Sequence, residues 1–267
     1  LCLGSHPLDL LEGADLVCVS GGVPLNIPFL QEAARRRIKL SNDSQVFLEA
    51  CPAPVVGITG SAGKTTTTAL LGLMARKFFE MKQSPRHAWV GGNIGNPLIE
   101  HVTEMQADDL VILELSSFQL ELMTVSPQVA VVLNITPNHL DRHKTMARYS
   151  EAKGNILRFQ RPGDVALLSA DDPGAQATRD HVRGRLRLFS RRGPVDDGAY
   201  AADGHIWLSG LGGRRALCPL SAIRLRGDHN VLNAMGVSNI FTVHNSAYVK
   251  NLEQNRSVHG HLQNIDG

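Results

Sequence analysis

The sequence predicts an α/β fold in which helices flank a mostly parallel β-sheet, because three apolar segments have the character of buried strands. The stretch Val55–Thr68 has the pattern of a buried strand, a glycine turn and the start of a helix. Leu110–Leu115 is apolar on both faces apart from Glu114, which is typical of a central parallel strand, and Val129–Ile135 repeats the pattern. Such segments, separated by helical patterns, favour parallel βαβ units.

The composition fits a packed protein and excludes several other classes. The chain has 267 residues, enough for one large domain or two ordinary ones, with 43% hydrophobic and 19% charged residues. A net charge of +2 does not indicate a nucleic-acid partner, and no apolar run reaches the roughly 18 residues of a membrane span. We interpret Arg35–Arg37 and Arg191–Arg192 as solvated faces. The four cysteines form no Cys-x-x-Cys pair, which fits a reducing cytoplasm without a zinc site.

Residues 1–52 predict a partial Rossmann-like unit. A strand at Asp15–Val19, a helix from about Pro28 to Arg37 and a strand near Ile38–Leu40 follow a βαβ order. The loop that begins at Ser20 lies at the carboxyl end of the first strand, where α/β sheets bind ligands. An anion contact and an ordinary βα turn are both open for it. The first residues lack an initiator Met, so we expect the sequence to start inside a longer protein.

The turn after the Val55 strand predicts a P-loop-type phosphate site. Residues 60–63 have little side-chain bulk, so their backbone N–H groups can converge on a phosphate. Lys64 adds a cation, and Thr65 adds a hydroxyl at a helix N-terminus. The strict motif has Gly six residues before the lysine, where this chain has Ile58, so the match is to the shorter Gly-x-x-Gly-Lys-Thr.

Polar residues also occur at the ends of the later strands. Glu114 lies near the carboxyl end of its strand, where a carboxylate is costly unless it pairs or binds a cation. His139 follows Val129–Ile135. In a parallel sheet these strand ends meet at the edge that carries Lys64. A structural ion pair for Glu114 and an ordinary loop position for His139 are the alternatives, and Lys153, on a predicted helix at Met146–Arg158, would ordinarily be solvated.

The pattern changes after Gly163. A strand at Asp164–Ser169 and a hairpin around Gly204–Leu208, with Gly, Arg and Asp scattered between them, predict an antiparallel addition to the main sheet. Leu225–Ala234 has the pattern of a turn that opens a helix. After Gly236 the helical periodicity fades, and we expect a poorly packed tail.

Five blocks of residues resemble the Mur ligase family in its order and approximate spacing. They are Thr59–Thr66, Gly91–Gly95, Leu113–Glu121, Asn134–Arg142 and His229–Ala234. The block at Leu113–Glu121 favours the branch that joins D-glutamate to UDP-N-acetylmuramoyl-L-alanine. The resemblance covers about residues 10–235.

The resemblance implies three parts and a shortened chain. Residues 1–52 would be a partial UDP-binding N-terminal domain, residues 53–236 the central ATP-binding domain, and residues 237–267 a tail outside the family. The family's opening strand and its C-terminal domain, which holds D-glutamate, have no counterpart here. We therefore expect a chain truncated at both ends and inactive alone. The family's Ser-Pro-Gly uridine diphosphate loop would start at Ser20, but Gly21 replaces the proline.

The implied reaction belongs to peptidoglycan precursor synthesis. ATP with Mg²⁺ would phosphorylate the substrate carboxylate to an acyl phosphate, and the amine of D-glutamate would then displace phosphate. The implied catalytic residues are Lys64, Glu114, His139 and Lys153, the last where the family has a carbamylated lysine. The implied magnesium ligands are Thr65, Glu114, His139 and Lys153.

The same resemblance implies the binding residues. ATP would contact Gly60, Ser61, Ala62, Gly63, Lys64, Thr65, Thr66, Asn230 and Asn233. The muramoyl substrate would contact Ser20, Asn93, Ser116, Gln119 and His139. Two alternatives stay open: a non-catalytic nucleotide-binding fragment or pseudo-enzyme, and a folylpolyglutamate-synthase-like ligase, which the Phe118-Gln119 pair disfavours. The sequence does not indicate an oligomeric state.

Overall fold

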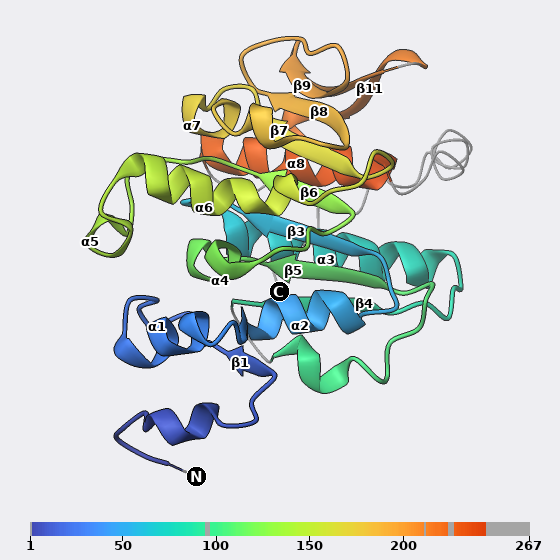
Figure 1. Cartoon of the computed structure of the whole chain (residues 1–267). Helices are drawn as coiled ribbons and strands as arrows, with labels where there is room; N and C mark the ends of the chain where they lie inside the picture. Colours follow the sequence, from blue (N-terminus) through green and yellow to red (C-terminus); the bar gives the residue numbers. More distant parts are fainter. Residues whose placement is uncertain (1, 94–96, 211, 224–226, 244–267) are drawn as a thin grey trace.

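A nine-stranded sheet forms the centre of the molecule in the computed structural model, which describes residues 2–93, 97–210, 212–223 and 227–243. Its strand order is β11-β10-β9-β8-β7-β6-β3-β5-β4 (Figure 1). The strands are β3 (Val55–Thr59), β4 (Ala88–Gly92), β5 (Leu110–Glu114), β6 (Val129–Val132), β7 (Val165–Ser169), β8 (Arg185–Ser190), β9 (Gly198–Ala202), β10 (His205–Gly210) and β11 (Gly213–Pro219).

The seven strands β3 to β9 pair in parallel, which confirms the predicted α/β class. Helices pack on both faces of the sheet (Figure 1). One core cluster includes Leu71 of α3 and Met235 of α8, and the other includes Leu120 of α4 and Ile156 of α6. The helices are α3 (Lys64–Met81), η2 (Leu98–His101), α4 (Ser117–Leu122), α5 (Leu140–His143), α6 (Met146–Arg158), α7 (Pro173–Gln176), η3 (Arg179–His181), η4 (Leu220–Ala222) and α8 (Asp228–Val243).

The predicted antiparallel addition after Gly163 is wrong for its first half. Strands β7, β8 and β9 continue the parallel sheet, and only β10 and β11 are antiparallel. The arginines of β8 made its sequence unlike that of a buried strand. In the structure Arg185 and Arg187 both form ion pairs with Asp197. The β9–β10 hairpin is confirmed. It turns at Asp203-Gly204, with φ of 48° and 70°, the positive values that a type I′ turn needs.

The loss of helix expected after Gly236 is also wrong, because α8 continues to Val243. Val237 and Ile240 are buried in the core. The amide of Asn239 donates to Leu188 O (2.9 Å), which ties the helix to β8. Residues 244–267, the rest of the expected tail, lie outside the described residues.

The N-terminal region forms a separate two-stranded parallel sheet, which confirms the βαβ order. It contains η1 (Leu8–Leu11), β1 (Leu16–Cys18), α1 (Pro28–Arg35) and β2 (Lys39–Ser41), and α2 (Asp43–Ala50) leads on to β3. The amide of Asn42 donates to Gln119 O at 2.7 Å, and this contact joins the start of α2 to α4. No helix in the described part of the chain is long and apolar enough to cross a membrane.

Candidate active site

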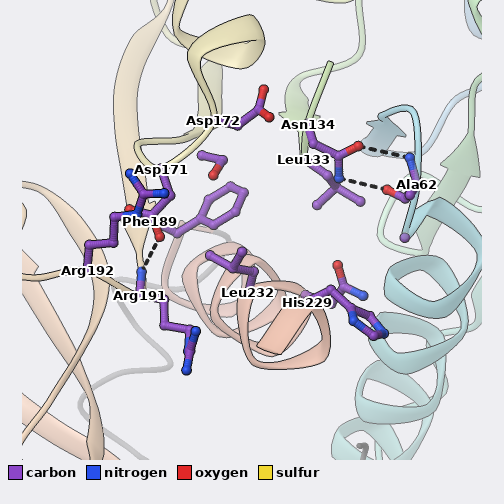
Figure 2. Close-up of a pocket in the computed structure, with 13 residues that line it drawn as sticks. Ala62, Leu133, Asn134, Asp171, Asp172, Phe189, Arg191, Arg192, His229 and Leu232 are labelled. Atoms are coloured by element: carbon purple, nitrogen blue, oxygen red, sulfur yellow. Dashed lines mark hydrogen bonds between the residues drawn. The ribbon is translucent and has the colours of Figure 1, made fainter. Parts of the chain in front are cut away.

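The phosphate loop between β3 and α3 is held in place by the end of β6. Asn134 Oδ1 accepts from Ala62 N at 2.9 Å, and Asn134 Nδ2 donates to Ala62 O at 3.0 Å (Figure 2). Ser61 N also donates to Asn134 O at 2.9 Å. Asn134 was assigned no separate role from sequence, although it opens one of the family-like blocks. Its paired bonds fix the backbone that would bind phosphate.

The N-terminal part of α8 lies against the same loop. Gly63 has φ of 84°, and a Cβ built there would lie 2.8 Å from Asn233 Oδ1. Asn233 Nδ2 in turn donates to Asn230 Oδ1 at 3.1 Å. Three of the expected ATP contacts are therefore neighbours in space. Thr65 and Thr66 are exposed on the first turn of α3.

Two lysines share one loop carbonyl. Lys64 Nζ donates to Gly60 O at 2.9 Å, and Lys153 Nζ donates to the same oxygen at 3.0 Å and to Thr59 Oγ1 at 3.2 Å. Lys153 is only 1% exposed, unlike an ordinary helix lysine. Burial, and then the nearby Lys64 charge, lower the pKa of Lys153 to about 7, with Glu114 opposing them. This amine is therefore partly neutral near pH 7.

Glu114 is a buried carboxylate with an unused oxygen. It is 2% exposed, and Oε1 accepts one long hydrogen bond of 3.4 Å from Asn93 Nδ2. Among the described residues, nothing donates to Oε2. An ionised carboxylate buried in this way needs a cation or further donors. The position fits one oxygen ligand of Mg²⁺.

The described chain offers no cluster of three or more His, Cys, Asp or Glu side chains that could hold a metal. A magnesium ion does not need one, because it commonly takes one or two protein oxygens and completes its shell with water and phosphate oxygens. Glu114, with the exposed Thr65 hydroxyl on α3, suits that kind of site.

His139 is connected to the same loop through Tyr149. Its exposed ring packs against Tyr149, with centroids 6.4 Å apart. Tyr149 OH is 3.0 Å from Ser61 Oγ, and Lys153 Nζ lies 4.9 Å from the Tyr149 ring centre. Tyr149 was given no role from sequence, although its place four residues before Lys153 puts both on one helix face.

Of the remaining predicted substrate residues, two form hydrogen bonds within the fold and two are exposed. Ser116 and Gln119 form a capping box at the start of α4, and Gln119 Nε2 donates to Ser44 Oγ at 2.7 Å. The hydrogen bonds of Gln119 thus stabilise the fold. Ser20 and Asn93 are exposed. Residues 94–96 of the second glycine loop lie outside the described residues.

A pocket of about 280 Å³ opens beside the phosphate loop, between the ends of β6, β7 and β8 and the start of α8 (Figure 2). Arg191 and Arg192 line it and are exposed, so the interpretation of this pair as a solvated face holds beside their position at the pocket. Asp171 shapes the wall by accepting from Ser190 Oγ and Arg191 N, both at 2.7 Å. The lining residues are Ala62, Gly63, Leu133, Asn134, Ser169, Asp171, Asp172, Phe189, Arg191, Arg192, His229, Leu232 and Asn233.

Comparison with known proteins matches the chain to one family. The model described as "Mur ligase middle domain" matches residues 58–241. A protein of Symbiobacterium thermophilum named UDP-N-acetylmuramoylalanine–D-glutamate ligase is 44% identical over 238 residues, which are 88% of this chain and 51% of that protein. A protein of the same name from a Thermoanaerobacter species is 38% identical over 238 residues, 89% of this chain and 51% of that protein.

Solved structures agree in fold. MurF from Acinetobacter baumannii superposes with a TM-score of 0.55 at 21% identity, over 79% of this chain and 48% of that one. A murein peptide ligase from Neisseria meningitides, titled UDP-N-acetylmuramate:L-alanyl-gamma-D-glutamyl-meso-diaminopimelate ligase, gives 0.54 at 17% identity, over 86% and 75%. The chain spans about half the length of the curated relatives it matches.

Proposed function

The chain belongs to the Mur ligase family, and from that premise we propose that it carries the ATP site of a ligase joining D-glutamate to UDP-N-acetylmuramoyl-L-alanine. The names of the relatives support the choice of substrates. The observation that carries the proposal is the junction at Gly60, where Lys64 and Lys153 meet one carbonyl beside the buried Glu114. A lysine cation, a second lysine whose amine is partly neutral, and an under-used carboxylate at this loop suit phosphoryl transfer.

The phosphate loop would bind the β- and γ-phosphates of ATP. The backbone N–H groups of residues 60–63 and the α3 N-terminus would supply hydrogen bonds. Lys64, which bonds to loop carbonyls at 2.9 and 3.4 Å, would turn to the phosphates. Asn233, which lines the pocket, and its hydrogen-bond partner Asn230 would lie near the nucleoside.

Glu114 and the Thr65 hydroxyl would hold one magnesium, and His139, at the carboxylate end of the substrate, would hold a second. Bound magnesium would neutralise charge that develops on the phosphate oxygens. The substrate carboxylate oxygen would attack the γ-phosphorus, and ADP would leave, which gives the acyl phosphate. The amine of D-glutamate would then attack the acyl carbon, losing a proton as phosphate leaves.

Lys153 would act as a carbamate. Its buried nitrogen, with a pKa lowered to about 7 by burial and by Lys64, is partly neutral and could attack carbon dioxide with loss of one proton. The product is an anion in the place of an ammonium. That sign of charge suits a site with two magnesium ions, where an ammonium would repel them.

A second candidate is a nucleotide-binding fragment without turnover, and the chain spans about half the length of its relatives. The purified chain would be titrated with ATP and Mg²⁺ and with UDP-N-acetylmuramoyl-L-alanine, and phosphate release would then be followed with D-glutamate. Turnover supports the ligase. Binding of both ligands without turnover supports the fragment, and absence of ATP binding contradicts both. Lys64→Ala is the control for nucleotide binding, while Lys77→Ala, on the exposed face of α3, should bind normally.

A further inference from the structure

The side chain of Arg142 connects the N-terminal loop after β1 to the segment that carries His139. Nη1 donates to Gly22 O at 2.9 Å and Nη2 donates to Val23 O at 2.5 Å. The planar guanidinium presents two nitrogens in a rigid fork that matches two neighbouring carbonyls, whereas a lysine would reach both only from a single nitrogen. Arg142 belongs to a family-like block, but neither the sequence nor the proposed chemistry gave it a role.

Phe118 extends this connection to His139. The Arg142 guanidinium lies 5.1 Å from the Phe118 ring centre, and the His139 ring meets the same ring edge-on at 5.2 Å. A Cβ built on Gly21 would lie 3.6 Å from Phe118 Cβ, so the loop backbone passes beside the base of this side chain. One aromatic side chain therefore contacts the loop, the arginine and the histidine.

The base of this cluster is held by α4. His143 stacks on Phe118 with ring centres 5.2 Å apart and an angle of 6° between the planes. His143 Nε2 lies 2.9 Å from Ser117 Oγ, and His143 is 4% exposed. His143 therefore gives Phe118 a fixed support on one face, while Phe118 also contacts Arg142 and His139. A displacement of the loop that moves Arg142 would thus change the packing around His139.

We propose that Arg142 is a positioning residue that fixes loop 20–23 relative to His139. The two parts of the site that bind the two ends of a sugar-nucleotide substrate are then held at a constant distance and orientation. The inference rests on the proposed function, in which the loop meets the uridine diphosphate and His139 serves the carboxylate end. The nucleotide end and the reacting end would be coupled through Arg142 and Phe118.

The first test measures binding and coupling. In Arg142→Ala, we expect UDP and UDP-N-acetylmuramoyl-L-alanine to bind about tenfold more weakly, with ATP affinity unchanged. Arg142→Lys, which keeps the charge but not the fork, should show a smaller loss. Arg148→Ala, an exposed arginine on α6, is the matched control and should bind like the wild type. Binding of UDP to Arg142→Ala at wild-type affinity would overturn the proposal.

The coupling has its own signature. In protein with labelled histidines, UDP should shift the His139 ring resonance of the wild type and of Arg148→Ala, but not that of Arg142→Ala. A shift that persists in Arg142→Ala contradicts the positioning role, because a contact that only supported folding would leave this coupling intact.

A ligand-free measurement separates this inference from the proposed function. Val23 N donates to Ser20 O within the loop, and we expect hydrogen exchange at this amide to be about tenfold faster in Arg142→Ala. If the wild type binds no uridine nucleotide, the proposed substrate is wrong, and exchange still decides whether Arg142 fixes the loop. Unchanged exchange would overturn the inference. Should Arg142→Ala fail to fold, Arg142→Lys carries both tests.

Discussion

The two ends of β5 each carry a buried carboxylate, and the protein treats them differently. Asp109, just before the strand, is 3% exposed and accepts from His87 N (2.7 Å), the Trp89 indole (2.8 Å) and Gln106 N (3.0 Å). Burial would raise the pKa of Asp109, but these hydrogen bonds outweigh it and hold the pKa below its usual range. Asp109 is thus fully satisfied by the chain.

Glu114, at the other end, is as buried but receives a single hydrogen bond of 3.4 Å within the described residues, with none to Oε2. Equal burial therefore does not mean an equal role. A carboxylate that the fold satisfies stabilises the fold, whereas one that the fold leaves under-used is available to a cation. The experiments below separate these two roles.

The largest effect is expected at Glu114. Glu114→Gln should lower ligase turnover by about a thousandfold, because a magnesium ligand is lost. In binding experiments, ATP affinity should no longer respond to Mg²⁺. The free energy of unfolding should stay the same or rise, since a buried charge is removed. A variant that unfolds more easily and keeps its Mg²⁺ response would identify Glu114 as another structural carboxylate.

Asp109→Ala should give the opposite result. Three donors lose their acceptor, so we expect the free energy of unfolding to fall by about 3 kcal/mol, measured by urea denaturation. ATP affinity and its Mg²⁺ dependence should match the wild type. Because the pKa of Asp109 is lowered, its stabilisation is present above the unfolded pKa and is lost as pH falls through the folded value. Weaker ATP binding in the folded variant would contradict a purely structural role for Asp109.

Variants of Lys153 test whether the buried groups near Glu114 lower the free energy of unfolding. The pKa of Lys153 falls from 10.5 to about 7, so between these values the unfolded chain binds more protons than the native one. Wild-type stability should therefore rise with pH across this window. Lys153→Met, which lacks that penalty but also lacks two hydrogen bonds, should be about 2 kcal/mol more stable at pH 6, with the advantage shrinking towards pH 10. If the difference in unfolding free energy between Lys153→Met and the wild type does not change with pH, the pKa of Lys153 is not lowered in the native protein.

Lys153 also allows chemical rescue. Lys153→Ala should lose ligase turnover and regain part of it with added chloride or a short-chain carboxylate, which would restore the negative charge of a carbamate. Lys77→Ala, an exposed lysine on α3, serves as the control. No recovery in Lys153→Ala would count against carbamylation.

The smallest effect is expected from a pair of glycines with similar backbones. Gly63 and Gly13 have φ of 84° and 71°, but a Cβ meets Asn233 Oδ1 at 2.8 Å only at Gly63 and nothing within 4 Å at Gly13. Both alanine variants should lose about 1 kcal/mol of stability from the backbone term. Gly63→Ala should lose about 1 kcal/mol more, and its ATP affinity should fall. Equal losses would mean that the contact of α8 with the loop is unimportant.

The parallel core and the glycine turn between β3 and α3 could be predicted because their signals are local. The apolar run of β5 and the spacing of Gly60, Gly63 and Lys64 need no distant partner to be recognised. The continuation of the parallel sheet through β8 could not be predicted, because Arg187 is tolerated there only with Asp197, ten positions later, and with the carbonyl of Asn239 in α8.

The same reason explains what was missed in the candidate site. The burial of Lys153 depends on the Gly60 carbonyl, 93 positions earlier, and the role of Asn134 depends on the Ala62 backbone, 72 positions earlier. Sequence patterns show which residue types are present but not which distant groups satisfy them. The assignments of Ser20, Asn93 and Gln119 to substrate stay predictions.

The most direct test replaces magnesium with Mn²⁺ and locates it by anomalous diffraction in crystals of the chain with a non-hydrolysable ATP analogue. The account predicts manganese at coordination distance from Glu114 Oε2 and the phosphate oxygens, with Asp109 unchanged at the far end of the strand. Manganese bound only to the phosphates and solvent, with Glu114 Oε2 left as it is, would contradict it.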